Sequence, residues 1–398
     1  LLFLINSIGY RKMAKVELQR VVNKERVYAE YKKLCIQEIG KEQDDLIKLR
    51  LFYEKLFAFL HHYIFLKFNE DDNELYVFFK DKAFRLNYLK IETPYPFLMQ
   101  VLESYKQEKL GKIEVLDVFS IIEGYLARRI LCNIPTTGLN KFFAGLHKEI
   151  EYYLDSSQGY SYSEILSYIL QNRSGGVRIP RNTEIKSAID NNPIYTQRNN
   201  YINFILSSVD DYSKESNLLR QIASDNTDLS IEHIMPQKLN KKWIDSLGEY
   251  YQEEHLRYLH TLPNLTLTGY NSKYSNKDFA YKKSIENGFS DSPLLINRHL
   301  AQYEKWDFSS LKTRADWWYE NIVKLWPLPE SSFKPKVSEK ELYLLDKVDL
   351  KNTKIKSIIV MEEFYDCKTW SSAMGIILSK LFALEEVPID SIISDTFL

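Results

Sequence analysis

Two segments organise this chain: Ile231-Glu232-His233-Ile234-Met235-Pro236-Gln237 and Leu262-Pro263-Asn264-Leu265-Thr266-Leu267-Thr268-Gly269-Tyr270-Asn271-Ser272-Lys273. The first is a short apolar run with an acid and a histidine in its middle, and Pro236 favours an extended segment or turn before it. In the second, Leu265-Thr266-Leu267 alternates like a half-buried strand, and Thr268-Gly269 is typical of a turn. The lysines and aromatic residues that follow suit an amphipathic helix. The predicted order is strand, long excursion, strand, helix.

The acid and the histidine of the first segment suggest two chemical roles. Glu232 is a candidate oxygen ligand for Mg²⁺ or Mn²⁺. His233 is a candidate general base, because an unperturbed imidazole pKa of roughly 6.5 lies near working pH. A bound metal would neutralise charge on a phosphate oxygen while His233 activates water. The candidate contacts to a nucleic-acid backbone are Lys273, Lys277, Lys282 and Lys283.

Each of these residues also has a purely structural explanation. A Glu-His pair before a proline is most often a surface turn, and Asn264 alone would be a turn residue. Asn271 or Asn276 would be a helix N-cap, and the lysines a solvated helix face. The combination of the two segments, rather than any one residue, favours a catalytic site.

The combined motif resembles the HNH-type nuclease domain of GmrSD-like, modification-dependent (type IV) restriction endonucleases. The resemblance is carried by Glu232–Gln237, Asn264–Lys273, Ser275-Asn276-Lys277-Asp278-Phe279 and Lys282-Lys283, and it extends over residues 40–330. It implies a mainly α fold with an embedded ββα-metal (HNH, His-Me finger) core. It also implies a DNA substrate, a role in restriction and antiviral defence, and a preceding ParB-like NTPase domain that we expect to be missing from this chain.

The family motif assigns roles to individual residues by resemblance. His233 would be the base and Asn264 the residue that orients the base loop. Glu232 would bind Mg²⁺ or Mn²⁺ with Asn271 as second ligand, and Asn276 is a rival for that second position. The third motif position is therefore asparagine, as in HNN variants.

Two functions follow from this pattern. The first is a metal-dependent endonuclease that hydrolyses DNA phosphodiesters in bacterial defence. The alternative is a catalytically weak DNA-binding or partner-binding module that retains the nuclease scaffold. Pro263 is relevant to the alternative, because the family usually has glycine there, and proline lacks an N–H and fixes φ.

Length and composition limit the number of domains, the DNA-binding surface and the cellular compartment that we expect. With 398 residues and 44 % apolar content, we expect a helical domain over 1–195, a nuclease domain over 196–330 and a small, truncated α/β appendage over 331–398. The net charge of −1 requires any DNA-binding surface to be local. Three distant cysteines fit a reducing cytoplasm, and no apolar run approaches the roughly 20 residues of a membrane span.

Three further groups of residues are predicted to be structural. His255 and His260 lie five residues apart, a spacing that matches no common ligand pair. Arg128-Arg129 are expected to brace the helical core through carboxylates and carbonyls. Trp317, Trp318 and Trp326 are expected to pack rather than stack on bases.

Overall fold

A computed structural model describes residues 27–39, 46–69, 73–156, 159–214, 217–224, 228–269, 274–335, 353–361 and 363–383. The chain forms two compact units, residues 1–336 and 337–398. Asn271 and Lys273 lie outside the described residues. None of the helices in the described ranges combines the length and apolar character needed to cross a membrane.

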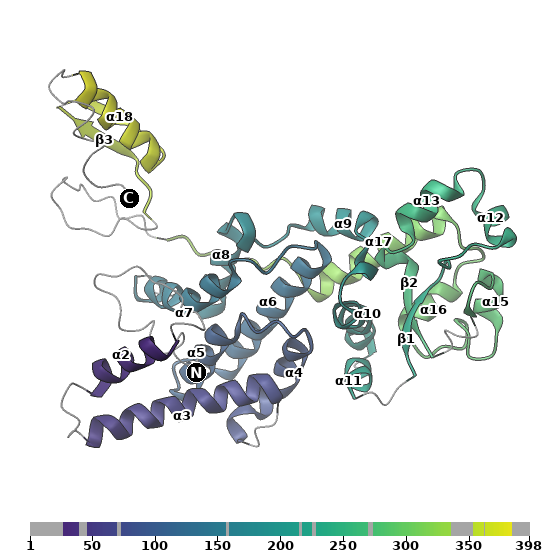
Figure 1. The fold of residues 1–398 in the computed structure, drawn as a ribbon, viewed down its shortest axis with the longest axis horizontal. Coiled ribbons are helices and arrows are strands. Elements are labelled where there is room, and N and C mark those ends of the chain that lie inside the picture. The colour runs from purple at the N-terminus through teal and green to yellow at the C-terminus, as the bar shows by residue number, and fades with distance from the viewer. Residues whose placement is uncertain are drawn as a thin grey trace. The chain divides into compact units, whose positions relative to one another are not determined.

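The first unit is mainly helical, as predicted (Figure 1). In the part of this unit that the structure describes, the strands are β1 (Ser230–His233) and β2 (Leu265–Thr268). Before β1 come α2 (Val27–Ile39), α3 (Leu46–Phe68), η1 (Glu74–Phe79), α4 (Lys80–Tyr88), α5 (Tyr95–Lys106), α6 (Lys112–Leu131), α7 (Leu139–Ser156), α8 (Tyr162–Asn172), η2 (Gly175–Val177), α9 (Asn182–Asn191), η3 (Ile194–Thr196), α10 (Asn199–Lys214) and α11 (Leu218–Ala223). Between the strands come α12 (Lys241–Leu247), α13 (Tyr251–Tyr258) and η4 (Leu262–Asn264), and after β2 come α15 (Phe279–Ser284), α16 (Leu295–Ala301) and α17 (Phe308–Leu325).

Polar side chains fix where several helices begin. At the start of α8, Ser161 accepts a hydrogen bond from the Glu164 N–H, and the Glu164 carboxylate accepts one from the Ser161 N–H. Asp307 caps α17 by accepting from the Ser310 N–H. Such caps satisfy backbone donors that have no partner within the helix, at a benefit of about 1 kcal/mol each.

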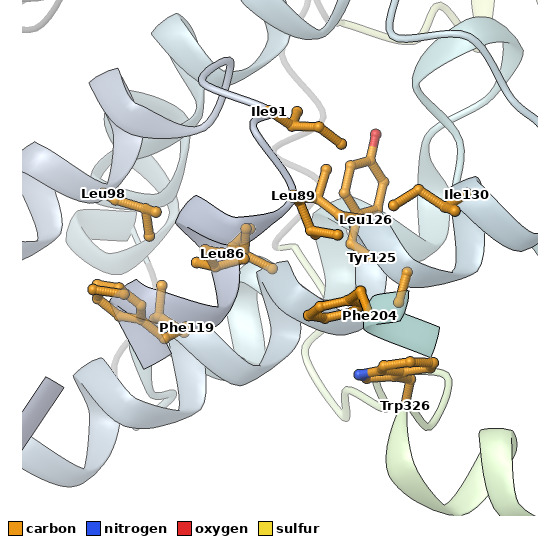
Figure 2. Packing of buried hydrophobic residues seen from close by; sticks show 14 of the residues in the cluster. Leu86, Leu89, Ile91, Leu98, Phe119, Tyr125, Leu126, Ile130, Phe204 and Trp326 are labelled. Carbon is orange, nitrogen blue, oxygen red and sulfur yellow. The ribbon is translucent and has the colours of Figure 1, made fainter. Parts of the chain in front are cut away.

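The core of the first unit centres on α5 and α6. Residues Tyr95–Ser104 of α5 are all buried, as expected of a helix enclosed by its neighbours. Figure 2 shows how Trp326, which follows α17, lies against Phe204 of α10 and close to α6. The two rings are stacked with centroids 5.6 Å apart. The tryptophan is therefore a packing residue, as predicted.

Two arginines of α6 are buried in this core. Arg128 donates to the carbonyl oxygens of Pro180 (2.8 and 2.9 Å) and Trp326 (2.9 Å). Arg129 donates to the carbonyl oxygens of Arg178 and Gly176. Burial lowers the pKa of Arg128 to about 10. Both side chains brace the fold, as predicted, through backbone carbonyls, and Arg128 also donates to the Asn182 side-chain oxygen at 2.7 Å.

The same apolar core continues from the helices into the strand pair. It includes Leu265 and Leu267 of β2 together with Phe204 and residues of α5 and α6. A second apolar cluster lies around Trp243 and Phe279. The division of this unit at residues 195 and 196 stays a prediction.

The second unit has an α/β pattern. Strands β3 (Ser357–Val360) and β4 (Glu363–Asp366) form an antiparallel pair, and helix α18 (Trp370–Ala383) follows. Lys380 of α18 forms an ion pair with Glu363 of β4 at 2.6 Å.

Candidate active site

The two sequence segments meet in an antiparallel strand pair. In β1 and β2, Glu232 lies opposite Thr266 and His233 lies opposite Leu265. The excursion between the strands carries α12 and α13, and α15 follows β2 (Figure 1). Helix α15 is shorter than the helix that the lysines and aromatic residues after Thr268-Gly269 suggested, because Asp278 caps α15 and the helix begins only at Phe279.

Strand β2 is more buried than its alternating sequence predicted. All four of its residues are buried, whereas the pattern indicated one solvated face. The reason is α16, which packs on β2 and presents Asn297. The Asn297 side chain pairs with the Thr266 hydroxyl and donates to the Leu267 carbonyl at 2.9 Å. The threonine is thus satisfied inside the protein rather than by water.

Asn264 holds the chain just beyond the end of β1 through a set of hydrogen bonds that we call the Asn264 clamp. Its side-chain oxygen accepts from the Met235 N–H at 2.8 Å, and its amide nitrogen donates to the carbonyls of Met235 (3.0 Å) and Leu259 (2.9 Å). Its backbone oxygen accepts from the Ile234 N–H at 2.9 Å. Because the residue is fully buried, these bonds are strong determinants of the loop conformation. Asn264 thus fixes the loop that follows His233, and its role beside a catalytic base stays a prediction.

Pro263 is compatible with this clamp. It lies in the short helix η4, at a first-turn position where a backbone N–H has no helical partner to lose. The Asn264 N–H still donates to the Thr261 carbonyl at 3.1 Å. The proline therefore fits the turn that leads into Asn264.

His233 lies at the end of β1 with only 5 % of its surface exposed. Its Nε2 is 3.1 Å from Nδ1 of His260, and its Nδ1 is 3.4 Å from Nε2 of Gln237. Burial, followed by the neighbouring His260, lowers the pKa of His233 to about 3. The imidazole is therefore neutral at physiological pH, and its pKa lies well below the working pH at which a general base is most effective, in contrast to the value of roughly 6.5 expected from the sequence.

Two aromatic neighbours of His233 were not predicted from the sequence as site residues. Tyr195 packs edge-on against His233 with centroids 4.3 Å apart, and it stacks on His260 at 5.3 Å. His260, predicted to be structural, thus contacts the candidate base directly. A signal for it existed in the sequence, because His260 lies just before Asn264, the residue expected to orient the loop after His233. Tyr195 is too distant in sequence to carry such a signal.

Glu232 is paired with a buried lysine. Lys282 Nζ lies 2.5 Å from Glu232 Oε1 and donates to the carbonyls of His233 (2.9 Å) and Ile234 (3.1 Å). Burial raises the pKa of Glu232 and lowers the pKa of Lys282, while the attraction between the two charges opposes both shifts.

The prediction that Lys282 contacts a DNA backbone is therefore wrong. Its side chain is 0 % exposed. The helix explains this, because Phe279 lies three residues earlier on the same face and is itself buried. Among the other candidates, Lys277 is exposed, and Lys283 is half-buried with its ammonium donating to the Tyr303 carbonyl at 2.9 Å. Asn276 is exposed in the turn before α15.

One family model matches the part of the chain that contains this site. Residues 179–319 match the C-terminal domain of GmrSD restriction endonucleases. The match supports a GmrSD-like C-terminal region, and we call residues 179–319 the GmrSD-type domain. No curated protein matches the chain.

The GmrSD-type domain holds every described member of the site. It begins before α9 and ends within α17, so it contains both strands, Tyr195 and His260. The matched family is one of restriction endonucleases.

The described part of the GmrSD-type domain supplies some, but not all, of the ligands expected for a divalent metal. No three His, Cys, Asp or Glu side chains of the described residues gather closely enough to hold an ion. Glu232 fits the role of a ligand, because a carboxylate suits Mg²⁺ and Mg²⁺ keeps several water ligands. Lys282 already pairs with its Oε1, so a metal would have to share this carboxylate with a buried ammonium.

Proposed function

We propose that the GmrSD-type domain carries a ββα-metal (HNH-type) nuclease centre that hydrolyses DNA phosphodiesters in bacterial defence. The family is one of restriction endonucleases, which implies nuclease activity and a DNA substrate. One observation supports the centre most: the Asn264 clamp fixes the loop beside a neutral, buried His233. The order β1, β2, α15 is compatible with a ββα core.

In the proposed mechanism, His233 accepts a proton from the attacking water. Asn264 holds the loop that follows His233 and so keeps the imidazole in place. Glu232 would hold a Mg²⁺ or Mn²⁺ ion together with Asn271, or with Asn276 as its rival. When bound, the ion would neutralise charge on the phosphate during displacement.

DNA would be held by a local basic surface, since the net charge of the chain is −1. Lys277 and Lys283, together with Lys273, remain the proposed backbone contacts. We place the protein in the cytoplasm, and the family resemblance adds an NTPase-like domain as a proposed partner.

The test is nicking of supercoiled plasmid with Mg²⁺ or Mn²⁺, on unmodified and modified DNA. We expect His233→Ala to reduce the rate by about 10²–10⁴-fold, the usual contribution of a general base. His61→Ala is the matched control, because His61 is an exposed histidine of α3, outside the GmrSD-type domain. Equal activity of wild type and His233→Ala would refute the assignment of the base.

A second function has one observation in its favour. The carboxylate of Glu232 is already neutralised by Lys282, so the scaffold holds together without a metal. This suits a module that binds DNA or a partner without cutting. Tight DNA binding with no metal-dependent nicking on any substrate would favour this second function.

A further inference from the structure

We propose that His260 is a positioning residue that sets the tautomer of His233 and directs its Nδ1 toward the attacking water. The inference rests on the proposed nuclease function and names a further residue of that site. The separation of 3.1 Å between His233 Nε2 and His260 Nδ1 is a hydrogen-bond distance. Between two neutral imidazoles, one nitrogen must donate and the other accept.

The surroundings of His233 decide the direction of this bond. Gln237 presents its amide nitrogen, a donor, to His233 Nδ1 at 3.4 Å. A proton on Nδ1 would therefore face a donor, so the proton belongs on Nε2, where it points at His260 Nδ1. His260 then carries its own proton on Nε2, and its partly exposed ring allows water to accept from it.

Tyr195 holds both rings in this arrangement. Its ring stacks on His260 with an interplanar angle of 10° and meets His233 edge-on at 68°. Its backbone N–H also donates to the His260 carbonyl at 3.1 Å, which ties the two chain segments together. The imidazole of His233 is thus restrained by a hydrogen bond at Nε2 and by ring packing.

The chemical consequence concerns where the proton goes. With Nε2–H committed to His260, only the Nδ1 lone pair of His233 can accept. The water proton moves to Nδ1, the water oxygen forms the new bond to phosphorus, and the bond from phosphorus to the leaving sugar oxygen breaks. That leaving oxygen takes a proton from solvent. Gln237 is exposed, so the attacking water can take its place as the donor to Nδ1.

Two substitutions of His260 separate the hydrogen bond from the ring packing. His260→Asn keeps an acceptor at the δ position and removes the ring. His260→Phe keeps a ring against Tyr195 and removes the acceptor. We expect His260→Phe to lower kcat for plasmid nicking by about 10- to 100-fold, the usual effect of losing such a supporting contact, with little change in KM. His260→Asn should retain most of the activity.

The tautomer itself is measured by NMR of the full chain with ¹⁵N-labelled histidine, using His233→Ala to assign the signals. We expect protonation at Nε2 of His233 in wild type and His260→Asn, and a mixture of tautomers in His260→Phe. Protonation at Nδ1 in wild type, or an unchanged tautomer in His260→Phe, would overturn the inference. So would full activity of His260→Phe beside an inactive His260→Asn. Because the NMR result does not depend on turnover, absence of nicking in wild type would count against the proposed function alone.

Discussion

At the scale of single residues, Lys282 shows what a buried charge does in this domain. Its ammonium contacts one carboxylate and two backbone carbonyls, all from β1 and the residue after it. A buried ion pair adds little net stability over apolar residues, but removing one partner leaves an uncompensated charge. The pair therefore matters most for holding the end of β1 in one conformation.

Removing the Lys282 charge should be strongly destabilising. We expect Lys282→Met to lower the free energy of unfolding by about 3–5 kcal/mol, because Glu232 would remain buried without its partner. Lys277→Met is the matched control on an exposed position before the same helix, and it should change stability by less than about 0.5 kcal/mol. Urea unfolding measures both values. A loss below about 1 kcal/mol for Lys282→Met would show that the pair contributes little.

The same residues show why parts of the site were predictable. His233, Glu232 and Asn264 stand out because polar groups suited to catalysis interrupt apolar, strand-like segments. Lys282 looked like one of several surface lysines, and only its spacing from Phe279 indicates the inner face of a helix. Tyr195 reaches the site through tertiary packing, which a single sequence does not encode locally.

At the scale of elements, the contact between α16 and α17 contains a histidine whose surroundings lower its pKa. His299 of α16 stacks on Trp317 of α17 with centroids 4.2 Å apart. Its Nδ1 is buried with no hydrogen-bond partner among the described residues. Burial, followed by the charge of Arg314, lowers the pKa of His299 to about 4.

Lowering the pH should therefore lower the free energy of unfolding of the domain through protonation of His299. Its folded pKa lies below the unfolded value of about 6.5, so the unfolded chain binds the proton more readily as pH falls from about 6.5 to 4, and stability is lost in that window. We expect His299→Phe, which keeps the stack on Trp317, to make stability less dependent on pH. Urea unfolding between pH 7 and 4.5 tests this; identical slopes for variant and wild type would contradict it.

The order of elements was more predictable than their burial. The strand, excursion, strand, helix order follows from turn residues and apolar spacing. The full burial of β2 does not, because it depends on Asn297 of α16 supplying a partner for Thr266. A threonine predicted to face water is satisfied instead by a residue 31 positions further along the chain.

At the scale of the whole molecule, metal binding should be visible as a change in stability. If Glu232 holds Mg²⁺ or Mn²⁺, saturating metal at 100 times its Kd would add about 2.7 kcal/mol to the native state. We expect Tm to rise with metal for wild type and for His61→Ala. Glu232→Gln should show no such rise, whatever its own Tm. An equal rise in all three proteins would assign the metal to another place.

The limits of the family match and the limits of the folded unit differ. The match ends at residue 319, within α17, while the chain continues to Trp326, which packs on Phe204. We therefore expect a fragment of residues 179–319 to be unfolded or aggregated. A fragment of residues 27–336 should unfold in one cooperative transition. Circular dichroism and calorimetry of the two fragments test this, and a well-folded short fragment would contradict it.

Arg128 links the matched region to the rest of the folded unit. It lies in α6, outside the matched region, yet it holds Pro180 at the start of that region and Trp326 just after its end. One side chain from outside the matched region thus holds the chain near both ends of that region. A protein into which residues 179–319 were transplanted would have to supply equivalent hydrogen-bond donors, so the matched region is not an interchangeable part.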